Sequence, residues 1–406
     1  MDLSGALHRR AGIAPTGTPL RRRGEAVRAV RSDSRSAARA AAGPAAAGRR
    51  GAQATGGGVD PRQQPARGKC AGDDPRAGRR IDRGAVVNGG RPSPAEPLPP
   101  PRAELVALAA AVPPGIKFGT ASWTVDGWAG DVYHRSYRGA QPAARLEEYV
   151  RYPLFRTVGI NSAFYESPSE RILDAYARAL PEGYSCVVKV WDRITARRFI
   201  RDRRWGPLAG QLNPDFLDAR LFLGSVLARY ARVFSRHSIC FVFQFQAMRG
   251  ADLLDAAAWA ERLDRFFGQL PQDFRYAVEL RNAELLTDHH GAVLERHGVA
   301  HVFNSWTEMP PIGTQLHLPW TLAAPFTVAR ALLKPGRKYA EAVRAFEPYD
   351  RVKEVLPELR RDLLRLMGEA ERRGIEALIH VNNRAEGNAP GTIRELAEQW
   401  INGRGP

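Results

Sequence analysis

The stretch from Ser238 to Asn282 decides the fold. It opens with the apolar run SICFVFQF (238–245), continues with AAAWAERLDRFFGQL (256–270) and ends with YAVELRN (276–282). The outer two runs are rich in β-branched and aromatic residues and predict strands, whereas the middle run repeats apolar residues at helical spacing. A strand, a helix and a second strand in this order predict two parallel strands joined by a crossover helix.

The same unit recurs along most of the chain. We predict eight strands, at residues 116–123, 157–164, 185–191, 238–245, 276–281, 300–304, 314–320 and 376–383. Helical patterns lie between them, except after the sixth strand, where the connection is too short for a full helix. Eight alternations in roughly 290 residues fit a (β/α)8 TIM-type barrel better than an open doubly wound sheet. No Gly-rich dinucleotide fingerprint follows the first strand, which further disfavours the open sheet.

The N-terminal residues have a different composition. No Phe, Trp or Tyr precedes Phe118, and residues 1–101 are dominated by Ala, Gly, Arg and Pro. Such a segment buries too little apolar surface to fold, so we predict a disordered extension followed by a barrel domain over residues 102–406. Residues 1–100 hold 19 of the 60 basic and 8 of the 43 acidic residues, so most of the net charge of +17 belongs to the extension. A solvated tail and an upstream extension translated from a misassigned start both remain open.

The sequence also bears on the cellular location. No stretch approaches the ~20 apolar residues that span a bilayer, and the N-terminus lacks the apolar core of a secretory signal. Cys70, Cys186 and Cys240 lack the spacing of metal ligands and suit a reducing compartment. We therefore expect a cytoplasmic protein that does not contact membranes.

Two charges on the fifth strand suggest a catalytic site. Alternation of side chains places Glu279 and Arg281 on the same, inward face, and the third strand directs Lys189 into the same space. We predict these three as catalytic residues, with Glu279 as general base and with Lys189 and Arg281 stabilising negative charge. The alternative is a buried ion-pair network that merely fills the barrel.

Other polar and aromatic side chains stand at the predicted strand ends, where TIM barrels place their chemistry. Amides can orient hydroxyl groups, and aromatic rings can stack on a sugar or a base. For any single aromatic residue, including Trp128, Phe164 and Trp306, core packing is the alternative. The predicted substrate-binding residues are Trp123, Asn161, Tyr165, Trp191, Gln244, Asn304, His317, Asn382 and Asn383.

Three segments near the predicted opening favour an anionic ligand. RITARRFIRDRRWG (193–206) holds six arginines and one aspartate, ARALLKPGRKY (329–339) follows the seventh strand, and NNRAEGNAPGT (382–392) follows the eighth. Loops after the last two strands commonly hold phosphate in TIM barrels. Histidines and carboxylates are scarce at the strand ends, so we predict no metal and no cofactor. The predicted anion-binding residues are Arg330, Lys334, Arg337, Lys338 and Arg384.

Several motifs carry a family resemblance. The stretches concerned are FGTASWTVDGWAGDVY (118–133), GINSAFYESPS (159–169), KVWDRIT (189–195), YAVELRN (276–282) and VNNRAEGNAP (381–390). In this order they resemble the signatures of the YecE-like family, domain of unknown function 72, over nearly all of residues 116–402. The resemblance implies a TIM-type barrel and no settled biochemical activity. This chain departs from it at Gly159, where many members carry Glu.

Three functions remain open at this point. The first is an enzyme, of hydrolase, isomerase or lyase class, that acts on a small anionic substrate, phosphorylated or sugar-like, at the C-terminal mouth of the barrel. The second is a nucleic-acid-binding or nucleic-acid-processing protein that uses the basic loops. The third is a non-catalytic ligand-binding barrel. The sequence does not fix the oligomeric state.

Overall fold

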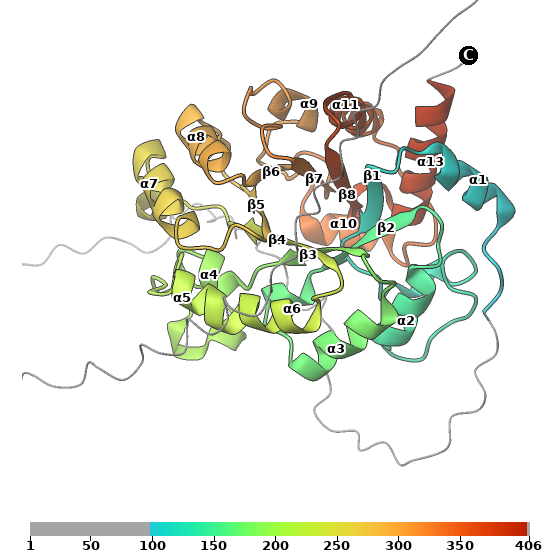
Figure 1. Cartoon of the computed structure of the whole chain (residues 1–406), viewed down its shortest axis with the longest axis horizontal. Helices are drawn as coiled ribbons and strands as arrows, with labels where there is room; N and C mark the ends of the chain where they lie inside the picture. The colour runs from blue at the N-terminus through green and yellow to red at the C-terminus, as the bar shows by residue number, and fades with distance from the viewer. Residues whose placement is uncertain (1–97, 404–406) are drawn as a thin grey trace, which may run out of the picture. The chain divides into compact units, whose positions relative to one another are not determined.

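Eight parallel strands form a closed barrel in the order of the chain (Figure 1). The structure is a computed structural model that describes residues 98–403. Each strand pairs with the next, and β8 pairs with β1, which confirms the predicted (β/α)8 fold. The strands are β1 (Ile116–Thr120), β2 (Phe155–Ile160), β3 (Ser185–Lys189), β4 (Ser238–Gln244), β5 (Arg275–Glu279), β6 (Ala300–Asn304), β7 (Phe326–Ala331) and β8 (Glu376–Val381).

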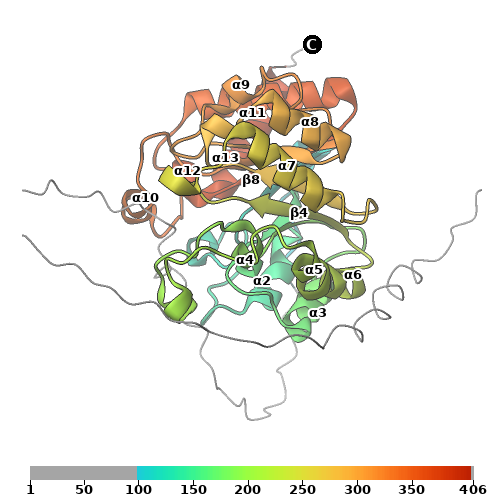
Figure 2. The ribbon, with the colours of Figure 1, turned by 90° about the vertical axis from the view of Figure 1, so that its left-hand side faces the viewer.

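Helices follow the strands and cover the outside of the barrel. Figure 2 shows α2 to α6 on one side, with α7, α8 and α11 on the other. The helix α1 precedes β1. The helices are α1 (Ala103–Ala111), α2 (Pro142–Tyr149), α3 (Glu170–Ala179), α4 (Asp192–Thr195), α5 (Ala219–Phe222), α6 (Ala228–Val233), α7 (Ala256–Phe267), α8 (Asp288–Arg296), α9 (Ile312–Gln315), α10 (Tyr339–Phe346), α11 (Pro357–Arg373), α12 (Asn383–Glu386) and α13 (Ala389–Asn402).

The two faces of each strand are buried in different places. Outward residues such as Phe241 and Phe243 pack against the helices, where Phe222 contacts both rings. Inward residues form a separate apolar layer in the middle of the barrel, which includes Val242 and Val328. This division is the period-two alternation of a β-strand, so the parity of a residue decides whether it can reach the barrel interior.

Charged side chains close the N-terminal end of the barrel. Glu376 at the start of β8 lies 2.8 Å from the amine of Lys117 and 2.7 Å from the guanidinium of Arg275. Lys117 also donates a hydrogen bond to Ser185. The apolar layer and this cluster together fill the lower part of the barrel, which leaves the C-terminal end for a ligand.

The predicted seventh strand, 314–320, is wrong. Those residues form the end of α9 and the turn after it, and β7 lies further along the chain at Phe326–Ala331. The segment TQLHLPW alternates apolar and polar residues like a strand, whereas β7 is buried on both faces and shows no alternation. A charged residue within β7, Arg330, also made this run look like a loop. The charge of Arg330 is compensated by Glu279 of β5, a contact between strands that the local sequence does not reveal.

Two further expectations concern the ends and the surface of the chain. Residues 1–97 of the predicted disordered extension lie outside the described part of the chain. Across residues 98–403, every helix is too short or too polar to traverse a lipid bilayer.

Candidate functional site

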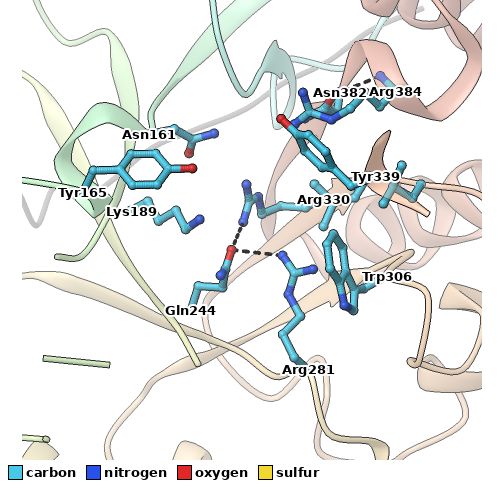
Figure 3. Close-up of a pocket in the computed structure, with 12 residues that line it drawn as sticks. Asn161, Tyr165, Lys189, Gln244, Arg281, Trp306, Arg330, Tyr339, Asn382 and Arg384 are labelled. Atoms are coloured by element: carbon cyan, nitrogen blue, oxygen red, sulfur yellow. Dashed lines mark hydrogen bonds between the residues drawn. The ribbon is translucent and has the colours of Figure 1, made fainter. Parts of the chain in front are cut away.

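A pocket opens at the C-terminal ends of the strands (Figure 3). The space that the centre of a water molecule can reach in this pocket is about 60 Å³. The pocket can therefore hold several waters or one small ligand group. The residues that line it come from both halves of the barrel. They are Asn161, Tyr165, Lys189, Gln244, Arg281, Trp306, Arg330, Leu332, Leu333, Tyr339, Asn382 and Arg384.

Four of the lining side chains are cationic. Lys189 ends β3, Arg281 follows β5, Arg330 belongs to β7 and Arg384 belongs to α12. The first three are at most 6% exposed. No Asp or Glu lines the pocket among the residues that the structure describes. The pocket is therefore strongly positive and largely shielded from water.

Glu279 lies below the pocket and does not line it. Its side chain is fully buried, one oxygen is 2.6 Å from the guanidinium of Arg281, and the other accepts a hydrogen bond from Arg330. Gln244 Oε1 accepts from Arg281 at 3.0 Å and from Arg330 at 3.2 Å. Glu279 and Gln244 thus hold the two guanidinium groups side by side.

The charge state of Glu279 follows from its neighbours. Burial raises the pKa of this carboxyl. The charges of Arg281, Arg330 and Lys189 together lower it by more, so the net pKa lies below the ordinary value. Glu279 is therefore ionised at neutral pH and acts as a fixed negative charge between two arginines.

Aromatic rings hold the cations from the other side. The guanidinium carbon of Arg281 lies 3.7 Å from the ring centre of Trp306, and that of Arg384 lies 4.3 Å from the ring centre of Tyr339. The amine of Lys189 lies 3.5 Å from the ring centre of Phe164. Contacts of this kind fix the direction of a long cationic side chain without neutralising its charge.

The structure brings about half of the predicted site residues together. Glu279 lies directly beneath the pocket. The predicted residues that line the pocket are Lys189, Arg281, Asn161, Tyr165, Gln244, Asn382, Arg330 and Arg384. The predicted residues that lie elsewhere are Trp123, Trp191, Asn304, His317, Asn383, Lys334, Arg337 and Lys338.

The two predicted tryptophans lie beyond the ends of their strands. Trp123 follows β1 by three residues, donates a hydrogen bond to the carbonyl of Pro142 and packs edge-on against Tyr176. Trp191 follows β3 by two residues and contacts the guanidinium of Arg193. Strand alternation no longer fixes side-chain direction at these positions, so the parity that suggested them does not apply.

The predicted asparagines outside the pocket hold the backbone of the loops. Asn304 donates to the carbonyl of Leu280 and accepts from the amide of Trp306. Asn383 accepts from the amide of Ala389. Asn304 therefore positions a lining residue, Trp306, instead of contacting a ligand itself.

The predicted basic loop after β7 is paired with an acid. The amine of Lys334 lies 2.9 Å from Glu354, and Arg337 pairs with the other oxygen of the same carboxylate. Lys338 is exposed at the start of α10. His317, placed on a strand by the wrong seventh element, lies in an exposed turn after α9.

The arginine-rich segment 193–206 is attached to the pocket rim. Arg204 pairs with the buried carboxylate of Asp192, donates to the carbonyl of Tyr165 and covers its ring at 5.2 Å. Burial raises the pKa of Asp192 to about 6, against the lowering effect of Arg204 and Lys189. Two other arginines of this segment, Arg193 and Arg198, pair with aspartates at 2.5 Å. Half of its six arginines are thus paired with acids.

Sequence reasoning did not assign four lining residues to the site: Trp306, which it named only among the aromatic residues at strand ends, and Leu332, Leu333 and Tyr339. Leu332 and Leu333 directly follow β7, and the wrong position of that strand concealed them. Tyr339 begins α10 at the end of the basic run 329–339. An aromatic residue directly after a basic turn was the available signal for Tyr339.

The departure at Gly159 has a structural counterpart. A Cβ atom at this position would lie 3.0 Å from Nδ1 of His380 and 3.0 Å from the carbonyl oxygen of Thr120. Burial and, to a lesser extent, the charge of Arg330 lower the pKa of His380 to about 3, so this imidazole is neutral. Gly159 thus leaves room for this neutral ring.

A metal centre finds no support in the described residues. Within positions 98–403, no three His, Cys, Asp or Glu side chains lie close enough together to hold a metal ion. Burial raises the pKa of the thiols of Cys186 and Cys240, so neither is a ready thiolate ligand.

Comparison with known proteins places the chain in a family. No curated protein matches it. Two solved structures of DUF72 family proteins are similar to it: one from Enterococcus faecalis V583, with 15% identity over 71% of this chain and 94% of that one at a TM-score of 0.48, and one from Thermotoga maritima MSB8, with 17% identity over 70% and 98% at 0.47. The model of the family described as "Protein of unknown function DUF72" matches residues 117–405. Because this match spans well over half of the sequence, the chain belongs to the DUF72 family.

Proposed function

We propose that this chain is an enzyme that acts on a small anionic molecule, phosphorylated or sugar-like, bound at the C-terminal mouth of the barrel. The observation that carries the proposal is the group of four cationic side chains, Lys189, Arg281, Arg330 and Arg384, in a pocket that no carboxylate of residues 98–403 lines. An excess of buried positive charge is costly unless an anion compensates it. The pocket also lies at the end of the barrel where TIM-barrel enzymes hold their substrates.

The geometry changes the role expected for Glu279. A general base must come within hydrogen-bond reach of the proton that it takes, and Glu279 is fully buried below the pocket between two arginines. Its role in this proposal is to position Arg281 and Arg330. Those arginines bind the anion, and Lys189 is the group that donates or accepts a proton, because a lysine amine changes its protonation readily when it is buried.

One observation favours a second candidate, the non-catalytic ligand-binding barrel. Neither an imidazole nor a carboxylate lines the pocket in the part of the chain that the structure describes. Proton transfer to a ligand therefore rests on Lys189 and on the phenols of Tyr165 and Tyr339. Turnover of a bound anion that is lost in Lys189→Met, at ligand concentrations that still saturate this weaker-binding variant, distinguishes the enzyme from the binding protein.

The basic loops give the nucleic-acid alternative less support than their sequence suggested. Lys334 and Arg337 share Glu354, and Arg193 and Arg198 each have an aspartate partner. Paired charges contribute little to phosphate binding, since a nucleic acid must compete with the carboxylate already present.

Thermal unfolding in the presence of small anions tests the proposed function. A ligand that binds the folded state raises the melting temperature by mass action. We expect phosphate esters or sugar acids to raise it for the wild type and not for Arg281→Ala. If no anion raises the melting temperature of the wild type, the proposal is wrong.

A further inference from the structure

The charges around the pocket do not balance. Four cationic side chains line it, and one carboxylate, Glu279, lies directly beneath them. Asp192, whose carboxylate also interacts with Lys189, is paired with Arg204, so this pair adds no net charge. In the described part of the chain, the cluster therefore carries three more positive charges than negative ones.

This excess favours one class of anion. A dianion offsets two of these positive charges, whereas a carboxylate or a sulfate ester, with one negative charge, offsets only one. Lys189, Arg281 and Arg330 are at most 6% exposed, so water and salt screen their charges poorly. Each additional ligand charge is therefore worth more here than at a protein surface.

The arrangement of the cations adds a geometric argument. Arg281 and Arg330 lie side by side, fixed by Glu279 and Gln244, while Lys189 and Arg384 approach from different sides of the same space (Figure 3). A planar carboxylate offers two oxygens in one direction. A tetrahedral phosphate group offers three in different directions, and guanidinium groups bind such oxygens in pairs.

The size of the cavity places the rest of the ligand at the rim. About 60 Å³ accommodates a head group and little more. The ring of Tyr165 lines the pocket and stays 43% exposed beside the guanidinium of Arg204, so its exposed part offers an apolar surface at the opening. An organic group attached to the phosphate would lie against this ring.

We propose that the pocket selects the dianionic head group of a phosphate monoester over monoanionic groups of the same shape. This inference rests on the proposed function, namely that an anion binds at the mouth of the barrel. It goes further by stating the charge and the geometry of the group that is bound.

Isothermal titration calorimetry with two matched ligands tests the inference. At pH 8 phenyl phosphate is a dianion, because the second pKa of a phosphate monoester is about 6. Phenyl sulfate has the same tetrahedral head and the same ring, with one negative charge. We expect phenyl phosphate to bind the full-length protein about tenfold more tightly or better, given the weak screening of the buried cations.

Each unfavourable outcome has a distinct meaning. If phenyl sulfate binds as tightly as phenyl phosphate, or if benzoate binds and neither of them does, the charge selectivity is wrong while anion binding at this pocket stands. If none of the three ligands binds and no anion raises the melting temperature, the proposed function itself is wrong.

A pair of variants assigns the selectivity to the pocket. Arg384→Gln removes one lining charge from a half-buried position and should reduce the preference for phenyl phosphate over phenyl sulfate. Lys334→Gln removes one exposed charge that does not line the pocket and should leave the preference unchanged. An unchanged preference in Arg384→Gln, or an equal reduction in both variants, would overturn the inference.

Discussion

Glu279 and Arg281, two residues apart at the end of β5, form an ion pair of 2.6 Å inside the barrel. A second arginine, Arg330 of β7, pairs with the other oxygen of the same carboxylate. Glu279 therefore joins two strands that are distant in sequence and fixes the two guanidinium groups that line the pocket. Its burial beneath them makes it a positioning residue.

Glu279→Gln should destabilise the protein strongly. The substitution keeps the shape of the side chain but leaves two buried arginines without their counter-charge, which typically costs about 3–5 kcal/mol. Urea denaturation at pH 7 measures the change in the free energy of unfolding. Glu261→Gln on the surface of α7, where the partner Arg265 is exposed, is the control and should change stability by less than about 1 kcal/mol. Similar losses in both variants would contradict the positioning role.

The sequence predicted the inner face of β5 because alternation is a local property. Parity within YAVELRN sufficed to direct Glu279 and Arg281 into the barrel, and the same reasoning on β3 located Lys189. Parity cannot reveal contacts between strands. The sequence therefore suggested Glu279 as a base facing a ligand, whereas Arg330, some fifty positions later, takes up its second oxygen.

Residues beyond the strand ends were harder to predict. Strand parity predicted that Trp123 and Trp191 line the pocket, but both lie beyond the ends of their strands, and Trp123 packs against Tyr176 of α3. Tyr339 lies in the pocket because α10 begins there, and the position of a helix relative to a barrel mouth depends on tertiary packing. The sequence predicted that the basic residues after β7 bind an anion. In the structure two of them, Lys334 and Arg337, pair with Glu354.

Asp192 should make the folding stability depend on pH in the direction opposite to that of most carboxylates. Burial raises its pKa in the folded protein to about 6, above the ordinary value near 4 in the unfolded chain. The folded state thus binds this proton more tightly, and stability should fall as pH rises from about 4 to about 6. At 1.36 kcal/mol per pKa unit the decrease is about 2–3 kcal/mol.

Urea denaturation across this pH range checks the contribution of Asp192. In Asp192→Asn the side chain is neutral at every pH, so this part of the decrease should disappear. Asp215→Asn, which removes the carboxylate that pairs with Arg193 in the neighbouring loop, is the control and should retain the decrease. An equal decrease in the wild type and in Asp192→Asn would show that this carboxyl titrates normally.

Trp306 and Trp191 offer a matched test of the pocket boundary. Both are half-buried tryptophans that follow strand ends and contact an arginine, but Trp306 alone of the two lines the pocket. In Trp306→Ala the guanidinium of Arg281 loses the ring that holds it, and we expect affinity for phenyl phosphate to fall about tenfold. Calorimetry should show unchanged affinity in Trp191→Ala. A greater loss in Trp191→Ala would place the ligand elsewhere.

Gly159→Ala should destabilise the barrel, although it adds a single methyl group. The new Cβ would lie 3.0 Å from Nδ1 of His380, 3.0 Å from the carbonyl oxygen of Thr120 and 3.1 Å from Cα of Ala121. Two of these three atoms belong to the backbone of β1 and the residue after it, so a shift of the His380 ring alone cannot relieve the contacts. Overpacking of this kind typically costs about 1–3 kcal/mol.

Gly224→Ala is the matched control for this prediction. Gly224 lies in the helical segment between α5 and α6, and a Cβ there would meet no atom within 4 Å. Alanine should therefore leave stability unchanged or raise it by up to about 1 kcal/mol, because glycine is a poor helix former. Urea denaturation of both variants separates the loss of a glycine from the crowding inside the barrel. If Gly159→Ala is as stable as Gly224→Ala, the space beside His380 is larger than the contacts indicate.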